Sequence, residues 1–182
     1  MPRSARCCAM PGRRETLVLG AVGLAAAAAG ALVGPLALQS ESGAADLLSA
    51  RYPDITGKPH RILEWQGRVL VCNFWATWCE PCRLEVPLLL ESRRKFLSRG
   101  AEVVGIGIDH AAKIIEFVKE FSIDYPVLIA DPSAIELMRK LGNRAGGLPF
   151  TVILGRAGSI GYRRLGLLKQ PDLDEAVVEM LG

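Results

Sequence analysis

Residues 73–83 read NFWATWCEPCR, and this stretch decides the fold. It continues a nearly unbroken apolar run, residues 69–74, of the kind that forms a central strand buried on both faces. Pro81 suits the first turn of a helix, because the backbone N–H that proline lacks would have no partner there. Cys79 and Cys82 are therefore predicted to lie where a buried strand passes into a helix.

This position gives the two cysteines a chemical use. The free N–H groups at a helix N-terminus stabilise an anion, so a thiol there is more acidic, and the thiolate is the reactive form. Cys82 follows Cys79 by one helical turn and can attack it in a mixed disulfide. The spacing predicts a redox-active Cys79–Cys82 disulfide that performs dithiol–disulfide exchange. We expect Cys79 to be the exposed nucleophile and Cys82 the shielded resolving cysteine.

The rest of the chain alternates between strand and helix patterns. Further strands are predicted at residues 103–108, 127–129, 151–154 and 159–163, and helices at 79–99, around 114–121, at 133–141 and at 171–181. Ser133 and Glu136 have the spacing of a capping box. The order β-α-β-α-β-α-β-β-α predicts an α/β domain with a central mixed sheet and helices on both faces.

The N-terminal region has a different composition. Residues 1–16 form a basic segment with four arginines and one glutamate, which equals the net charge of +3 for all 182 residues. The remainder is neutral overall, so the composition gives no support to a basic nucleic-acid surface. Residues 17–38 carry no charge and are long enough to cross a bilayer. They are predicted to be a transmembrane anchor or a cleaved signal sequence.

This arrangement sets the expected domain boundaries. Arginines before the apolar run and none directly after it predict that the C-terminal part lies outside the cytoplasm. Residues 39–52 are small and polar, and are interpreted as a tether. Residues 53–182 are predicted to form one domain.

No metal or organic cofactor is predicted. A structural zinc site usually needs four ligands, whereas the chain has a single CxxC pair and only His60 and His110 as histidines. Cys72 lies within the predicted buried strand and is interpreted as a core residue.

Three motifs together resemble a known family. These are NFWATWCEPC, Asp54-Ile55-Thr56-Gly57-Lys58 and Gly147-Leu148-Pro149. From about residue 53 to 181 the chain resembles thioredoxin-fold proteins. Within them it resembles the TlpA/ResA-like branch of extracytoplasmic thiol–disulfide oxidoreductases, which is related to the AhpC/TSA redoxins. The resemblance implies a thioredoxin fold with an extra strand–helix insertion within residues 101–125.

The resemblance also assigns roles around the cysteines. It implies that Pro149 follows a cis peptide bond and faces the CxxC pair, and that the backbone of Leu148 pairs with an extended substrate. Trp78 would form a wall of the substrate surface, and Glu80 and Pro81 would tune the redox potential. Family members often have valine or a β-branched residue before the proline, so Leu148 leaves the substrate preference open.

Glu85 is the third candidate catalytic residue. It follows Cys82 by three and so shares a helix face with it, although by pattern alone it could be a solvated glutamate. Ordinary thioredoxins carry a buried aspartate at the position of Asn73, and an amide cannot transfer a proton. Relatives with asparagine there have an acid at the position of Glu85, so the resemblance makes Glu85 the proton-handling group. We expect it to be buried with a raised pKa.

The function implied by the resemblance is reduction of disulfides in exported proteins, such as apocytochrome c during c-type cytochrome biogenesis. A membrane thiol–disulfide carrier would supply the electrons. Two other interpretations are a peroxiredoxin-like peroxidase and a non-enzymatic copper carrier or chaperone. The spacing disfavours both, because a peroxidatic site needs Thr-x-x-Cys, whereas Thr77 is two residues before Cys79, and a related copper carrier uses CxxxC.

Overall fold

The computed structural model describes residues 43–182. Its main sheet has five strands in the order β5-β4-β3-β6-β7. These are β3 (Val69–Trp75), β4 (Ala101–Ile108), β5 (Val127–Ala130), β6 (Phe150–Leu154) and β7 (Ile160–Leu165). β3, β4 and β5 are parallel to one another, β6 pairs antiparallel with β3, and β7 pairs antiparallel with β6, so the sheet is mixed. A separate hairpin pairs β1 (Arg51–Pro53) with β2 (Pro59–Arg61).

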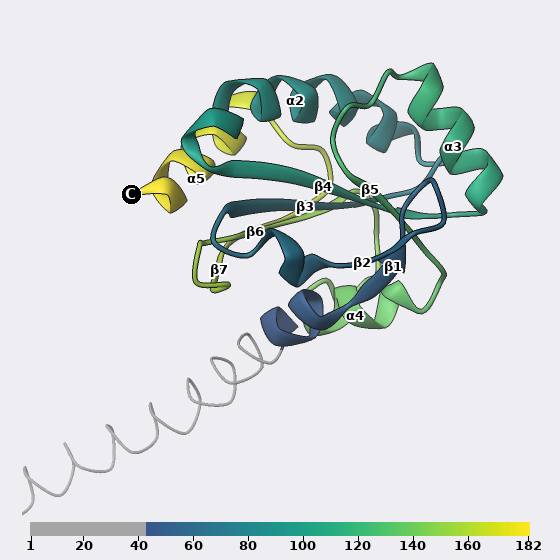
Figure 1. Ribbon diagram of the computed structural model, residues 1–182, viewed down its shortest axis with the longest axis horizontal. Coiled ribbons are helices and arrows are strands. Elements are labelled where there is room, and N and C mark those ends of the chain that lie inside the picture. Colours follow the sequence, from purple (N-terminus) through teal and green to yellow (C-terminus); the bar gives the residue numbers. More distant parts are fainter. Residues whose placement is uncertain (1–42) are drawn as a thin grey trace, which may run out of the picture. The chain divides into compact units, whose positions relative to one another are not determined.

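Helices cover both faces of the main sheet (Figure 1). On one face lie α2 (Glu80–Phe96), α3 (Ala111–Glu120) and α5 (Gln170–Leu181), and on the other lies α4 (Ala134–Lys140). Short 3-10 turns, η1 (Ile62–Trp65) and η2 (Leu97–Arg99), follow β2 and α2. The left-handed backbone of Gly100, with φ of 94°, ends the helical segment before β4, as the sequence predicted.

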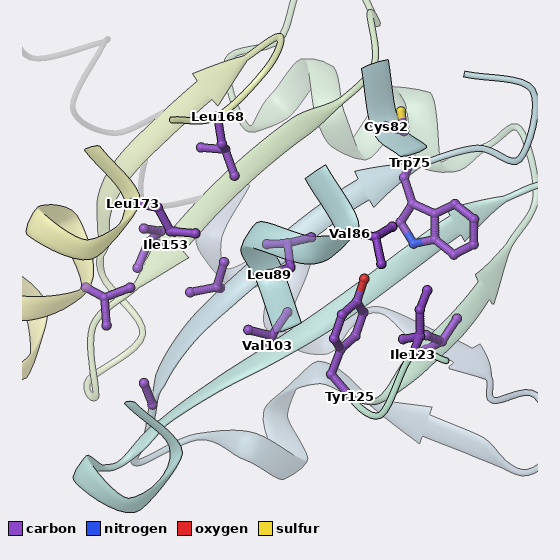
Figure 2. Close-up of a cluster of buried hydrophobic side chains, with 14 of the residues drawn as sticks. Trp75, Cys82, Val86, Leu89, Val103, Ile123, Tyr125, Ile153, Leu168 and Leu173 are labelled. Atoms are coloured by element: carbon purple, nitrogen blue, oxygen red, sulfur yellow. The ribbon is translucent and has the colours of Figure 1, made fainter. Parts of the chain in front are cut away.

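Two apolar clusters fill the space on either side of the sheet. Side chains alternate along β3, so Val69, Val71 and Trp75 face α2, α3 and α5, while Leu70, Cys72 and Phe74 face α4. Figure 2 shows the first cluster, where Val86 and Leu89 of α2 meet side chains from the sheet and from α5. The predicted central strand is therefore buried on both faces.

From β3 to α5 the predicted α/β order is confirmed, with two local differences, whereas the β1–β2 hairpin before it was not predicted. The Ser133–Glu136 capping box does not form, because the Asp131 carboxylate accepts from the Ser133 N–H at 2.7 Å and Glu136 pairs with Arg139. The insertion was expected within residues 101–125. β4 and α3 occupy that range, and the edge strand β5 lies just beyond it.

The expected tether at residues 39–52 is wrong from residue 43 onward, and its first four residues lie outside the described residues. Residues 43–49 are helical, and residues 51–53 form β1. Leu47 is fully buried in the α4-side cluster, and Asp46 forms an ion pair with Lys140 at 2.8 Å. Gly43 packs so close to α4 that a Cβ would lie 2.6 Å from the Lys140 carbonyl oxygen. Although the stretch is mostly polar, the buried Leu47 and the closely packed Gly43 thus dock this segment on the domain.

Replacing Leu47 with alanine should measure this docking. Removing a fully buried leucine side chain is expected to lower the free energy of unfolding by about 2–5 kcal/mol. Leu63→Ala, at an exposed position, is the matched control and should change it by less than about 0.5 kcal/mol. Urea denaturation of the full chain and both variants would make the comparison. Equal stability of Leu47→Ala and the unmodified protein would contradict the docking and support the interpretation of this segment as a tether.

The predicted basic segment and apolar run, residues 1–38, lie outside the described residues. Among residues 43–182 no helix combines the length and apolar character that crossing a membrane requires.

Candidate active site

The two cysteines of the motif form a disulfide at the carboxyl end of the central strand. Their Cα atoms are 5.3 Å apart and their sulfur atoms are bonded at 2.09 Å. Cys79 is the N-cap of α2, and its carbonyl oxygen accepts hydrogen bonds from the N–H groups of Cys82 and Arg83 at 3.0 and 3.3 Å. Pro81 lies in the first turn. The predicted strand-to-helix placement is thus confirmed.

The exposure of the two cysteines differs from the prediction. Cys79 is 5% exposed and Cys82 is 3% exposed, so the expected nucleophile is almost as well covered as the expected resolving cysteine. Both side chains belong to the apolar cluster beneath α2. The preceding Trp78 is instead 71% exposed. The position at a helix N-terminus determines the electrostatic field at Cys79. The solvent access of Cys79 depends instead on neighbouring segments, which the motif does not specify.

The peptide bond between Leu148 and Pro149 is cis, as the resemblance implied. β6 begins at the next residue, and Phe150 pairs with Phe74 of β3, so Pro149 lies beside the strand end that carries the disulfide. The carbonyl oxygen of Pro149 accepts from the Gly166 N–H at 2.9 Å, which holds this loop against the segment after β7.

Glu85 is fully buried, as predicted, and both of its carboxyl oxygens have partners. The backbone N–H of Leu168 donates to Oε1 at 2.6 Å, and the side-chain amide of Asn73 donates to Oε2 at 3.0 Å. Asn73 also donates to the Thr151 hydroxyl at 2.9 Å. The four groups form one chain of hydrogen bonds beneath the first turns of α2.

Strand alternation brings these polar groups together. Asn73 shares the α2-facing side of β3 with Val71 and Trp75, and Thr151 shares that side of β6 with Ile153. Asn73 and Thr151 are also cross-strand partners in register. Neither Thr151 nor the Leu168 amide was predicted from the sequence. A polar residue at an inward position directly after the Pro149 turn was the available signal for Thr151, whereas a backbone amide leaves none.

Burial raises the pKa of Glu85 to about 7, against a usual value of 4.5. The hydrogen bonds from Leu168 and Asn73 and the charge of Arg164 act in the opposite direction but do not outweigh burial. Glu85 therefore changes between acid and carboxylate near neutral pH, which suits a group that accepts and returns protons.

The raised pKa of Glu85 predicts how the free energy of unfolding depends on pH. The folded state holds the Glu85 proton more tightly than the unfolded chain, so the carboxyl destabilises the fold as pH rises from about 4.5 through 7. Relative to Glu85→Gln, the free energy of unfolding of the unmodified protein should fall across this window by at most about 3 kcal/mol. Denaturant unfolding of both oxidised proteins at several pH values would measure it. A constant difference from pH 4 to 8 would contradict the raised pKa.

A second polar contact fixes the loop before Cys79. The Thr77 hydroxyl donates to Oδ2 of Asp109, a residue just after β4. Oδ1 of Asp109 accepts a hydrogen bond from the backbone N–H of His110 at 2.7 Å, and Nζ of Lys113 lies 3.9 Å from the same oxygen. Burial disfavours the charged form, yet the hydrogen bonds from Thr77 and His110 hold the pKa of Asp109 below its usual value. The carboxylate thus stays ionised at neutral pH and ties the cysteine loop to β4.

The other candidates lie away from this arrangement. His60 contacts the carboxylates of Glu64 and Asp54 at 2.7 and 3.3 Å in and beside the β1–β2 hairpin. His110 is exposed at the start of α3. Cys72 points into the α4-side cluster, and burial raises the pKa of its thiol to about 12, so it stays protonated. The interpretation of Cys72 as a core residue is confirmed.

The five-stranded mixed sheet, the CxxC disulfide at a helix N-terminus and the cis-proline directly before β6 define the class: a thioredoxin-fold protein with a dithiol–disulfide site. The chain belongs to the Redoxin family, which matches residues 45–179, and within it to the ResA/TlpA-like group.

Similar proteins support this assignment. Thiol-disulfide oxidoreductase ResA of Geobacillus thermodenitrificans is 25% identical over 123 residues, which cover 67% of this chain and 68% of the relative. A solved thiol:disulfide interchange protein of the thioredoxin family from Chlorobium tepidum is 30% identical with a TM-score of 0.64, covering 74% of this chain and 94% of its own. A putative DsbE from the same organism shares the fold, with a TM-score of 0.66 and 24% identity over 73% and 93% of the two chains.

Proposed function

We propose that this protein is a thiol–disulfide oxidoreductase that reduces disulfides in other proteins. The observation that carries the proposal is the Cys79–Cys82 disulfide at the N-terminus of α2, with the buried Glu85 carboxyl in the next helical turn. The described state is the oxidised form, which is the product of the reaction.

The reaction starts from the reduced protein. The Cys79 thiolate attacks one sulfur of the substrate disulfide, forms a mixed disulfide and releases the other substrate sulfur as a thiolate, which takes up a proton. The Cys82 thiol then loses its proton and attacks Sγ of Cys79. The Cys79–Cys82 disulfide forms, and the second substrate sulfur leaves as a thiol. The substrate gains two electrons, and the protein loses two.

Glu85 handles the proton of Cys82 in the second step. It shares a helix face with Cys82, and its pKa of about 7 lets the carboxylate accept a proton from the thiol at neutral pH. Asn73 and Thr151 position the carboxyl and hold no titrating proton themselves. In the reverse direction the protonated Glu85 returns the proton to the Cys82 thiolate.

The other parts of the proposal follow the family resemblance and the charge pattern. The domain works outside the cytoplasm, tethered to the membrane through residues 17–38. Leu148, Pro149 and Trp78 contact the substrate, and Glu80 and Pro81 tune the potential. Apocytochrome c or another exported protein with a disulfide is the substrate. A membrane thiol–disulfide carrier restores the dithiol, and the reaction uses no metal or organic cofactor.

The direct test is reduction of a disulfide-containing apocytochrome c peptide by the pre-reduced, full-length protein. One substrate disulfide should be lost for each Cys79–Cys82 disulfide formed, as counted by mass spectrometry after thiol alkylation. Hydrogen peroxide, offered in place of the peptide, should be consumed no faster than by free thiol. Fast peroxide turnover with an inert peptide would favour the peroxidase instead.

The redox potential should be that of a reductant. Strong oxidants of this fold have an unusually stable reduced form, because their nucleophilic thiol is very acidic. Glu80 places a negative charge between the cysteines, which disfavours the Cys79 thiolate and so makes the reduced form less stable. We expect a value nearer to about −270 mV than to about −120 mV. Glu80→Gln should shift it upward. Equilibration with glutathione buffers measures both, and a value above about −160 mV for the unmodified protein would contradict the assignment.

A further inference from the structure

A row of three polar side chains crosses the sheet on the side that carries α2. Asn73 of β3 is opposite Thr151 of β6, and Thr151 is in turn opposite Arg164 of β7. Directly opposed residues of antiparallel strands lie on the same face of a sheet, with Cβ atoms about 4.5–5.5 Å apart. The row therefore begins at the amide that holds Glu85 and ends at a guanidinium on the edge strand.

The backbone that follows Arg164 returns to the same carboxyl group. Four residues further along, the Leu168 N–H donates to Oε1 of Glu85 at 2.6 Å, whereas Asn73 donates to Oε2. Strand pairing fixes one end of this short segment and the hydrogen bond fixes the other. Arg164 is thus kept in the neighbourhood of the Glu85 carboxyl by the fold itself.

Arg164 is the charged side chain that acts on Glu85. It is exposed and lines an open cleft of about 320 Å³ between β7 and α5, and its positive charge lowers the pKa of Glu85. The phenols of Tyr125, before β5, and Tyr162, on β7, also lie near this carboxyl. Burial raises the pKa of both phenols, so they are neutral near pH 7. On α2 the two cysteines are joined in the disulfide.

The acidic residues of α5 do not bind Arg164 directly. Asp172, Glu175 and Glu179 line the same cleft from the helix. Within residues 43–182, none of them forms an ion pair with the Arg164 guanidinium. Solvent screens exposed carboxylates well, whereas a charge acts more strongly on a buried group. Arg164 is therefore available as a counter-charge for Glu85.

We propose that Arg164 is a positioning residue of the reaction, which stabilises Glu85 as the carboxylate that takes the Cys82 proton. The inference rests on the proposed function, because Arg164 acts through the role of Glu85. Its contribution is electrostatic: a cation on the edge strand favours a charged form that burial alone disfavours.

The first test titrates Glu85 itself in the full-length oxidised protein. NMR of its ¹³C-labelled carboxyl group should show a pKa that is higher by about half a unit to one unit in Arg164→Gln, and restored in Arg164→Lys. The difference should shrink in about 1 M salt, where charges on the surface are screened within about 3 Å.

Arg163→Gln is the matched control. It removes a positive charge from the next residue of the same strand, but this side chain lies on the α4 side of the sheet. A Cβ at Gly142, just after α4, would lie 3.6 Å from its Cδ. Arg163→Gln should leave the pKa of Glu85 unchanged.

The second test measures the rate at which the pre-reduced protein reduces a peptide disulfide. The rise in rate through about pH 7 should move upward in Arg164→Gln, which lowers the rate at pH 7 about two- to fivefold and leaves it unchanged above about pH 9. In a Glu85→Gln background, Arg164→Gln should have no further effect, because the group through which it acts is absent.

An unchanged pKa of Glu85 in Arg164→Gln, or an equal change in Arg163→Gln, would overturn the assignment. A loss of rate at every pH that Arg164→Lys does not restore would also overturn it and make Arg164 a structural residue. Failure of the unmodified protein to reduce any disulfide would instead refute the proposed function, while the NMR titration would still show whether Arg164 stabilises the carboxylate.

Discussion

Replacing Cys82 with serine is expected to convert the protein into a trap that stays covalently bound to its substrates. Cys79 can still attack, but serine cannot displace the substrate sulfur from the mixed disulfide, so the first step is retained and the second is lost. Turnover should fall to the uncatalysed rate, and substrate-linked protein should accumulate. Non-reducing electrophoresis followed by mass spectrometry would identify the linked partners in the native compartment.

The matched variants assign the roles of the cysteines. Cys79→Ser should lose turnover without forming traps, and Cys72→Ala should keep turnover, since Cys72 is buried on the opposite face of the sheet. This comparison matters because the two cysteines of the pair are almost equally covered in the oxidised protein. Traps that form through Cys82 in Cys79→Ser would reverse the assignment, and traps through Cys72 would give that thiol a role.

Glu85→Gln should slow disulfide exchange by about tenfold or more near neutral pH, which is the usual cost of losing acid–base assistance. Glutamine keeps the size of the side chain and can still accept one hydrogen bond, but it cannot take the Cys82 proton. The unmodified protein should gain rate as pH rises through about 7, where Glu85 becomes a carboxylate, and the variant should lack this dependence. Stopped-flow rates with a peptide disulfide would measure the profile.

Glu91→Gln provides the control, because Glu91 is exposed on the same helix. It should leave the rate and the pH profile unchanged. NMR titration of the Cys79 and Cys82 thiols in the reduced proteins would show whether they couple to residue 85. Unaltered thiol pKa values and an unaltered rate in Glu85→Gln would reduce Glu85 to a structural residue.

The sequence alone determined the features that depend on local pattern. The apolar run before Cys79 predicted β3, the CxxC spacing predicted the disulfide, and alternating strand and helix patterns predicted the order of the remaining elements. These succeed because hydrophobic periodicity, helix starts and glycine stops act over a few residues. The cis bond before Pro149 and the burial of Glu85 were expected through the family resemblance, since neither follows from spacing.

The tertiary structure decided what surrounds these residues. Thr151 and the Leu168 amide, which complete the hydrogen bonds of Asn73 and Glu85, lie 78 and 83 residues away from their partners along the chain. The covering of Cys79 and the hydrogen bond from Thr77 to Asp109 likewise arise only when β3 and β4 align in the sheet. Solvent access and pKa depend on every group packed around a side chain, and strand pairing brings those groups from distant segments whose contacts no local pattern records.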